Sequence, residues 1–198
     1  MSNSYPYIFV IAGPNGAGKS TCGPAVLQNH FHVSEFVNAD IIAAGLSAFH
    51  PENAAIEAGR IMLRRLRNLA EKRVSFAFET TLASRTFAPW ISRLKDDGYQ
   101  IVILFFWLHS PDLAVARVAE RVRLGGHSVQ EETVRRRYSN SIQNFFNLYQ
   151  KLADNWCVID NSVKSDPVTV AEGQRLNNTI IYQHVLWEKI ISVCNEKR

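Results

Sequence analysis

The sequence predicts an α/β fold, a three-layer sandwich in which helices cover both faces of a mostly parallel central sheet. The first observation is that short apolar runs alternate with amphipathic stretches, because parallel strands need long, usually helical crossovers. The second is a glycine-rich loop at 13–18, directly after the first apolar run. The third is that 46% of the 198 residues are hydrophobic and 20% are charged, which suits one buried core. We therefore expect a single domain over residues 1–198.

The N-terminal elements follow from apolar runs and helical spacing. Tyr7–Ala12 is an uninterrupted apolar run, typical of a strand buried on both faces. A helix is expected from near Lys19. From Pro51 onward, apolar residues recur at helical spacing with arginines between them, which indicates a long amphipathic helix. Val74–Phe78 is expected to form the next strand.

The central elements have clearer boundaries. Pro89–Asp97 is predicted to be a helix, because a glycine follows it. Gln100–Leu108 is the most hydrophobic stretch and should be the central strand. Ser110 and Pro111 suit an N-cap and a first helical position, so a helix is expected through about Arg123.

The C-terminal part should alternate in the same way. The glycine pair 125–126 ends the preceding helix, and a long helical stretch is expected over Gln130–Leu152. Trp156–Asp160 and Pro167–Ala171 are predicted to be short strands. A C-terminal helix over about 175–195 is expected to pack on the sheet.

Several classes of protein are disfavoured. The longest apolar run, Ile101–Leu108, has eight residues, whereas a membrane span needs about 20. The first fifteen residues contain no Lys or Arg and lead into a glycine loop, so no secretory signal is expected. Cys22, Cys157 and Cys194 are too far apart in the sequence for a disulfide framework or a metal motif. These features predict a cytoplasmic protein with reduced thiols.

A phosphate-binding loop is the most specific motif in the chain. It matches G-x-x-x-x-G-K-[ST] and comprises Gly13, Pro14, Asn15, Gly16, Ala17, Gly18, Lys19, Ser20 and Thr21. The glycines let consecutive backbone N–H groups point inward, and the following helix N-terminus adds partial positive charge. Lys19 should reach the β- and γ-phosphates, Ser20 should hold Mg²⁺, and Thr21 is a candidate for the α-phosphate. The predicted cofactors are therefore ATP and Mg²⁺.

The motif alone leaves the fate of the γ-phosphate open. A GTPase is disfavoured because the chain has no N-K-x-D element. An ABC-type ATPase remains an alternative, since 124–128 resembles that family's signature loop and Trp156–Asp160 suits a Walker B strand. Against it, Asn161 stands where a catalytic Glu is expected, and the chain is short for such a domain.

Asp40 is the candidate catalytic base. It follows the first helix in the stretch 37–40 and should lie at the end of a second strand, facing the γ-phosphate. A base there would accept the proton of an attacking hydroxyl, which is the usual task of Asp in phosphoryl transfer. The alternative is that Asp40 caps a helix beginning at Ile41.

A second polar group ends the next predicted strand. Glu79 is a candidate for Mg²⁺ through water or for a substrate hydroxyl, and Thr80 and Thr81 are candidates for hydrogen bonds to substrate. Arg85 is a candidate for a substrate phosphate. The alternative is a strand end with capping threonines and a solvated arginine.

Arginines are concentrated in one region. Of 22 basic residues 15 are Arg, and six of these lie within 117–137, where they predict a helical lid over the γ-phosphate. Arg121 and Arg137 are the catalytic candidates, and Arg117 is assigned to nucleotide binding. The alternative is a solvated face of Arg–Glu pairs. Nucleic-acid binding is disfavoured, since aromatic residues do not alternate with these arginines.

Taken together, these residues resemble the zeta toxin family of P-loop kinases, in particular its short bacterial members. The resemblance spans about 7–173 and is carried by Gly13–Thr21, Asn38–Asp40, Glu79–Thr81 and Gly125–Tyr138. One departure is Thr80, where the best-known members have a glycine.

The resemblance implies a P-loop kinase-like fold with an arginine lid. It also implies ATP- and Mg²⁺-dependent phosphorylation of a sugar hydroxyl of UDP-N-acetylglucosamine, which is toxic because it blocks peptidoglycan synthesis. By the same resemblance Asp40 is the base, Lys19 and Ser20 hold ATP and Mg²⁺, and Glu79 and Thr81 line the substrate side. Many members pair with an antitoxin, so an antitoxin is a possible partner. The alternatives are a kinase of another phosphorylated small molecule or a P-loop switch ATPase.

Overall fold

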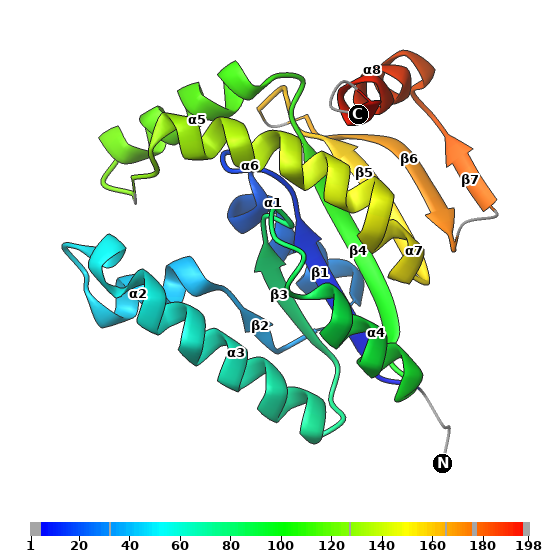
Figure 1. Ribbon diagram of the computed structural model, residues 1–198, viewed down its shortest axis with the longest axis horizontal. Coiled ribbons are helices and arrows are strands. Elements are labelled where there is room, and N and C mark those ends of the chain that lie inside the picture. Colours follow the sequence, from blue (N-terminus) through cyan, green and yellow to red (C-terminus); the bar gives the residue numbers. More distant parts are fainter. Residues whose placement is uncertain (1–4, 32, 127, 165, 176–177, 196–198) are drawn as a thin grey trace.

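A computed structural model describes residues 5–31, 33–126, 128–164, 166–175 and 178–195. Within these residues the chain forms one seven-stranded sheet with the order β2-β3-β1-β4-β5-β6-β7 (Figure 1). The strands are β1 (Tyr7–Ala12), β2 (Phe36–Val37), β3 (Phe76–Thr80), β4 (Gln100–Trp107), β5 (Asn155–Asp160), β6 (Val168–Gln174) and β7 (Asn178–Ile181). The first five strands of this order pair in parallel, and β6 pairs antiparallel with both of its neighbours, β5 and β7. The predicted α/β fold with a mostly parallel sheet is confirmed.

Helices lie on both faces of the sheet. They are α1 (Lys19–Val26), α2 (Ala39–Leu46), α3 (Ala55–Glu71), α4 (Ala88–Asp96), α5 (Pro111–Arg123), α6 (Glu131–Asn144), α7 (Gln150–Leu152) and α8 (His184–Asn195). The α4 and α8 helices pack aromatic rings on one face of the sheet. Trp90 of α4 contacts Phe78 edge to face, and Trp187 of α8 stacks on Trp156 with 5.9 Å between the ring centroids. The α1 helix lies on the opposite face, next to Ile11.

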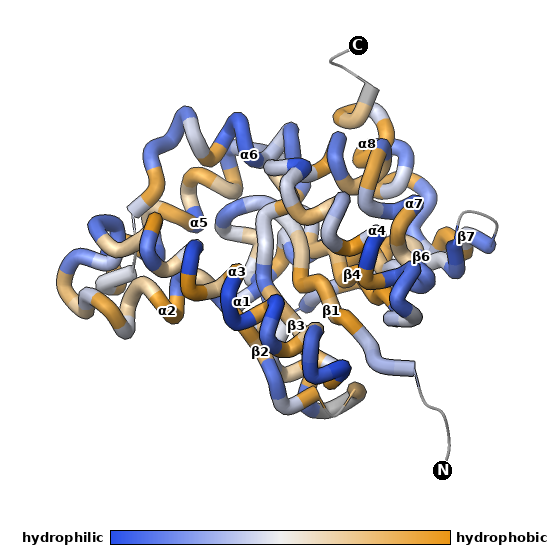
Figure 2. The backbone as a smooth tube through the Cα atoms, turned by 60° about the horizontal axis from the view of Figure 1, so that its bottom comes forward, coloured by the Kyte–Doolittle hydropathy of each residue, from blue (hydrophilic) through white to orange (hydrophobic). Residues whose placement is uncertain are grey.

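The central strand and the helix after the glycine pair are as predicted. All of β4 after Gln100 is buried. The predicted helix over Gln130–Leu152 is α6, a π-helical turn at Phe145–Tyr149, and α7. Phe145 stacks on Phe105 of β4 with 4.5 Å between ring centroids, which fixes α6 against the sheet. In Figure 2, hydrophilic and hydrophobic residues alternate along α5 and α6, as in helices that cover a sheet.

Two boundaries near the site and the C-terminus differ from the predictions. The strand predicted at Val74–Phe78 is Phe76–Thr80, because Val74 still belongs to the turn after α3 and its N–H donates to the Leu69 carbonyl. The C-terminal helix predicted over 175–195 begins only at His184. The residues before it form β7, which pairs with an extended β6, so sheet pairing replaces the expected helical turn.

None of the helices in the described part of the chain is long and apolar enough to cross a membrane.

Candidate active site

The carboxyl ends of the parallel strands open into a cleft of about 890 Å³. Its walls come from the phosphate-binding loop, the start of α2, one face of α3, the end of β3 and the α5–α6 hairpin. Of the candidates named from the sequence, the cleft is lined by Asn15, Gly16, Gly18, Lys19, Ser20, Thr21, Asp40, Glu79, Thr80, Thr81, Arg117, Arg121 and Arg137. The structure therefore brings most of the predicted site residues together.

The phosphate-binding loop has the backbone that its glycines allow. Gly13, Gly16 and Gly18 have φ values of 136°, 77° and 82°, in a region that side chains disfavour. A Cβ atom at Gly13 would lie 2.0 Å from the Phe106 carbonyl oxygen. Only glycine fits there, so the loop is held tightly against β4.

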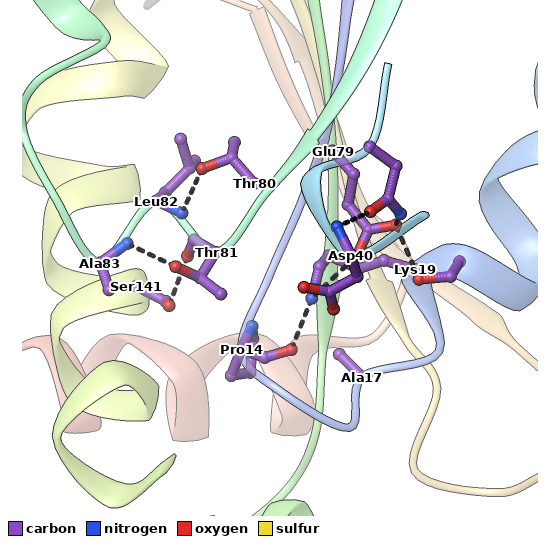
Figure 3. Close-up of polar contacts among 12 residues, drawn as sticks. Pro14, Ala17, Lys19, Asp40, Glu79, Thr80, Thr81, Leu82, Ala83 and Ser141 are labelled. Carbon is purple, nitrogen blue, oxygen red and sulfur yellow. Dashed lines mark hydrogen bonds and ion pairs between the residues drawn. The ribbon is translucent and has the colours of Figure 1, made fainter. Parts of the chain in front are cut away.

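Lys19 is buried at the base of the cleft. Its ammonium donates a hydrogen bond to the Pro14 carbonyl oxygen at 2.9 Å and lies 3.7 Å from the Glu79 carboxylate (Figure 3). Burial lowers the pKa of Lys19, and the charge of Arg121 adds to this, while Glu79 and Asp40 act in the opposite direction. Both carboxylates and Arg121 therefore lie close enough to Lys19 to affect its titration.

The Glu79 carboxylate is the centre of a polar network. One oxygen accepts hydrogen bonds from the Ser20 hydroxyl at 2.8 Å and from the Asn38 amide at 2.7 Å. A hydroxyl and a carboxylate at this distance form an all-oxygen pair, which is the chemistry that Mg²⁺ prefers. The described residues contain no cluster of three or more His, Cys, Asp or Glu suited to a metal. Ser20 and Glu79 therefore offer two oxygen ligands to a Mg²⁺ ion at this place.

Asn38 takes the capping role that was considered for Asp40. The Asn38 side-chain oxygen accepts hydrogen bonds from the backbone N–H groups of Asp40 and Ile41, at 2.7 and 3.3 Å. The α2 helix accordingly begins at Ala39, and Asn38 is its N-cap. The Asp40 side chain is exposed to the cleft rather than used as the cap.

Thr80 and Thr81 shape the loop that follows β3. Their hydroxyl oxygens accept hydrogen bonds from the backbone N–H groups of Leu82 and Ala83, at 3.1 and 3.3 Å (Figure 3). Leu82 is buried and has a φ of 54°, a strained value for a side-chain-bearing residue. The capping role considered for these threonines is therefore present, and both side chains also line the cleft.

The α6 helix holds this loop through main-chain carbonyls. The Ser141 hydroxyl donates to the Thr81 carbonyl oxygen, and the Asn144 amide donates to that of Leu82 at 2.8 Å. Ser141 and Asn144 are buried polar residues that the sequence analysis did not single out. Arg85 donates to the Asn144 side-chain oxygen at 3.3 Å and is not among the residues that line the cleft.

The arginines of the α5–α6 hairpin have different surroundings. Arg117 donates to the carbonyl oxygens of Asn161 and Ser162, at 2.7 and 2.9 Å, beneath the phosphate-binding loop. Arg121 and Arg137 line the cleft. Arg123 and Arg136 are exposed, and Arg135 forms ion pairs with Asp112 and Glu131. His127 lies outside the described residues.

Two asparagines of the site carried weak sequence signals. Asn38 precedes the first turn of a helix, a common N-cap position, but Asp40 was the more obvious candidate there. In the sequence, Asn161 stands out only because an ABC-type ATPase would have a catalytic Glu at this position. In the structure its amide donates to the Ala17 carbonyl oxygen at 2.8 Å, so it contacts the phosphate-binding loop directly.

The sequence is similar to a known protein family and to a protein of another organism. The family model described as Zeta toxin matches residues 1–186. An uncharacterized protein of Haemophilus influenzae is 28% identical over 126 residues, which cover 64% of this chain and 88% of that protein.

Solved structures share the fold at low sequence identity. The AvrRxo1-ORF1:-ORF2 complex with ATP has a TM-score of 0.75 at 14% identity over 96% of this chain, which spans 65% of that chain. A structure of the PezAT chromosomal toxin–antitoxin system of Streptococcus pneumoniae has a TM-score of 0.66 at 13% identity, covering 99% of this chain and 87% of that one. The similar structures, the P-loop and the parallel sheet show a P-loop kinase-like fold, and the match of the family model over residues 1–186 shows that the chain belongs to the zeta toxin family.

Proposed function

We propose that this protein is an ATP- and Mg²⁺-dependent kinase that phosphorylates a sugar hydroxyl of a UDP-amino sugar such as UDP-N-acetylglucosamine. The observation that carries the proposal is that one cleft contains a phosphate-binding loop, the exposed Asp40 carboxylate and two arginines, Arg121 and Arg137. A phosphate site alone would suit any nucleotide-binding protein. The added carboxylate suits an acceptor that must lose a proton.

The proposed reaction is a direct phosphoryl transfer. Asp40 accepts the proton of the acceptor hydroxyl, whose oxygen bonds to the γ-phosphorus of ATP while the bond to the β–γ bridging oxygen breaks and ADP leaves. Lys19, Arg121 and Arg137 stabilise the negative charge of the transferred group. We assign Thr21 to the α-phosphate and Thr80 and Thr81 to the acceptor side.

Ser20 and Glu79 are the proposed Mg²⁺ site. A bound Mg²⁺ would neutralise phosphate charge and orient the β- and γ-phosphates. Asn38 and Lys19 hold Glu79 in place, through the 2.7 Å hydrogen bond and the 3.7 Å ion pair. The protein thus has a fixed oxygen pair next to the loop where the phosphates are expected.

The same function implies a cell compartment and a binding partner for the protein. A kinase needs a supply of ATP and of its nucleotide-sugar acceptor, so we place it in the cytoplasm. The similar PezAT structure belongs to a toxin–antitoxin system, and on that likeness we propose that this chain also has an antitoxin partner.

The direct test is to incubate the purified protein with Mg²⁺, γ-labelled ATP and a panel of UDP-sugars, sugar phosphates and nucleosides, and to identify the products by mass. We expect a phosphorylated UDP-N-acetylglucosamine. Transfer to another phosphorylated compound would keep the kinase and change the acceptor. Release of ADP with no phosphorylated product would instead favour a P-loop switch ATPase.

A further inference from the structure

One wall of the cleft is a face of α3. Gly59, Met62 and Leu63 all line the cleft, and their spacing of three and four residues places them on the same side of the helix. Met62 is buried, whereas 43% of the Leu63 side chain is exposed. The α2 helix, which carries Asp40, packs against α3. This wall therefore adjoins the proposed base, on the acceptor side of the cleft.

Gly59 lies inside a helix of 17 residues, Ala55–Glu71. A glycine in a helix interior lowers the stability of the helix relative to alanine. Crowding explains another helical glycine, Gly23, because a Cβ atom there would lie 2.9 Å from the Ile11 side chain. At Gly59 a Cβ atom would meet no heavy atom of the described residues within 4 Å.

Backbone conformation does not explain this glycine either. Gly59 is not among the glycines with a positive φ, and its residue position is helical like that of its neighbours. The space above its Cα atom therefore opens into the cleft between Met62 and Leu63. The uncrowded Gly59 thus leaves space for a ligand in the cleft, whereas Gly45, which is equally uncrowded, does not line the cleft.

We propose that Gly59 determines acceptor specificity, because it lets a ring of the acceptor pack its face against the α3 backbone between Met62 and Leu63. This inference rests on the proposed kinase function. The ring is the pyranose or the base of a nucleotide sugar; the pyranose presents an apolar face of C–H groups and the base a flat π face, and either would pack on Leu63. The phosphates of ATP belong to the loop at 13–21, so a side chain at position 59 should obstruct the acceptor and not the nucleotide.

The test compares Gly59→Ala and Gly59→Leu with Gly45→Ala as the control. Gly45 lies in α2, and a Cβ atom there also meets nothing within 4 Å, but Gly45 does not line the cleft. We expect both alanine variants to unfold at a higher temperature than the wild type. With UDP-N-acetylglucosamine as acceptor, Gly59→Ala should raise the acceptor KM at least tenfold with an unchanged KM for ATP. Gly59→Leu should remove transfer while ATP still binds.

The control should keep the wild-type KM for both substrates. Unchanged acceptor KM values in both Gly59 variants, or an equal rise in the KM for ATP, would overturn the role of Gly59 and leave the kinase proposal intact. A wild-type protein that phosphorylates no member of the panel would overturn the kinase proposal and the role of Gly59 with it.

Discussion

The Asn161 amide donates a hydrogen bond to the Ala17 carbonyl oxygen at 2.8 Å and so joins the end of β5 to the phosphate-binding loop across 144 positions of sequence. Asn161 is itself held by Arg117, whose guanidinium donates to the Asn161 carbonyl oxygen at 2.7 Å. A Cβ atom at Gly18 would lie 2.2 Å from the Asn161 amide nitrogen, so the contact is close. The loop is therefore supported from beneath by side chains that are far away in the sequence.

Replacing Asn161 by alanine should weaken ATP binding by about tenfold, because a buried carbonyl of the loop loses its donor, a loss of about 1–3 kcal/mol. Calorimetric titration with a non-hydrolysable ATP analogue measures the affinity. Asn155→Ala, at the other end of β5, is the matched control and should bind like the wild type. Equal affinities in the two variants would show that the loop does not need this support.

Replacing Asp40 by alanine should reduce phosphoryl transfer by about 10²–10⁴-fold, because the acceptor hydroxyl loses its general base. ATP affinity and melting temperature should change little, since Asn38 and not Asp40 caps α2. Asn38→Ala gives the contrast, with a loss of about 1 kcal/mol in the free energy of unfolding. Undiminished transfer by Asp40→Ala would remove the assignment of Asp40 as the base.

Replacing Glu79 by glutamine should raise the Mg²⁺ concentration needed for half-maximal activity by about tenfold. The substitution keeps an oxygen that accepts from Ser20 and Asn38 but removes the negative charge that attracts the cation. Activity measured against Mg²⁺ concentration at saturating ATP gives this value. A Mg²⁺ dependence identical to that of the wild type would place the ion elsewhere.

The protein should lose stability above pH 10. Burial raises the pKa of Tyr149 to about 12, so the unfolded chain releases this proton near pH 10 while the folded protein retains it. Between these values the folded state binds more protons, and the free energy of unfolding falls as the pH rises. Tyr149→Phe should make this decline shallower in urea titrations from pH 9 to 11. Burial also raises the pKa of Tyr138, which should account for part of the remaining slope.

Replacing Asn144 by alanine should lower the free energy of unfolding by about 1–3 kcal/mol, because the Leu82 carbonyl loses its buried donor. It should also raise the acceptor KM more than the KM for ATP, since Thr80 and Thr81 form the loop that Asn144 holds. Asn140→Ala, in a partly exposed position of α6, is the control. A variant with lower stability but wild-type acceptor KM would limit Asn144 to a folding role.

The sequence predicts the phosphate-binding loop well because its conformation is local. Residues 13–21 specify their own backbone through glycine and through the strand and helix on either side. Asp40 lines the cleft for a related reason, since residues that follow parallel strands gather at one edge of a sheet.

The sequence does not explain why Arg137, rather than its two neighbours, should line the cleft. Arg135, Arg136 and Arg137 are consecutive on a helix and point about 100° apart, so the packing of α6 on the sheet decides that only Arg137 of the three lines the cleft. The prediction of where the C-terminal helix begins was wrong for a similar reason. The short stretch Asn178–Ile181 has only two apolar residues, so its pattern does not separate a helix from a strand, and its pairing with β6 decides for the strand.

The α6 helix contacts two sides of the cleft. It carries Arg137, which we assign to the phosphate donor, and one turn later Ser141, which holds the loop after β3 that we assign to the acceptor. With these assignments, a shift of α6 on binding of one ligand would be transmitted to the site of the other. By thermodynamic reciprocity, the factor by which ATP changes the affinity for the acceptor equals the factor by which the acceptor changes the affinity for ATP. On the proposed function, donor and acceptor binding would in this way be coupled through a single helix.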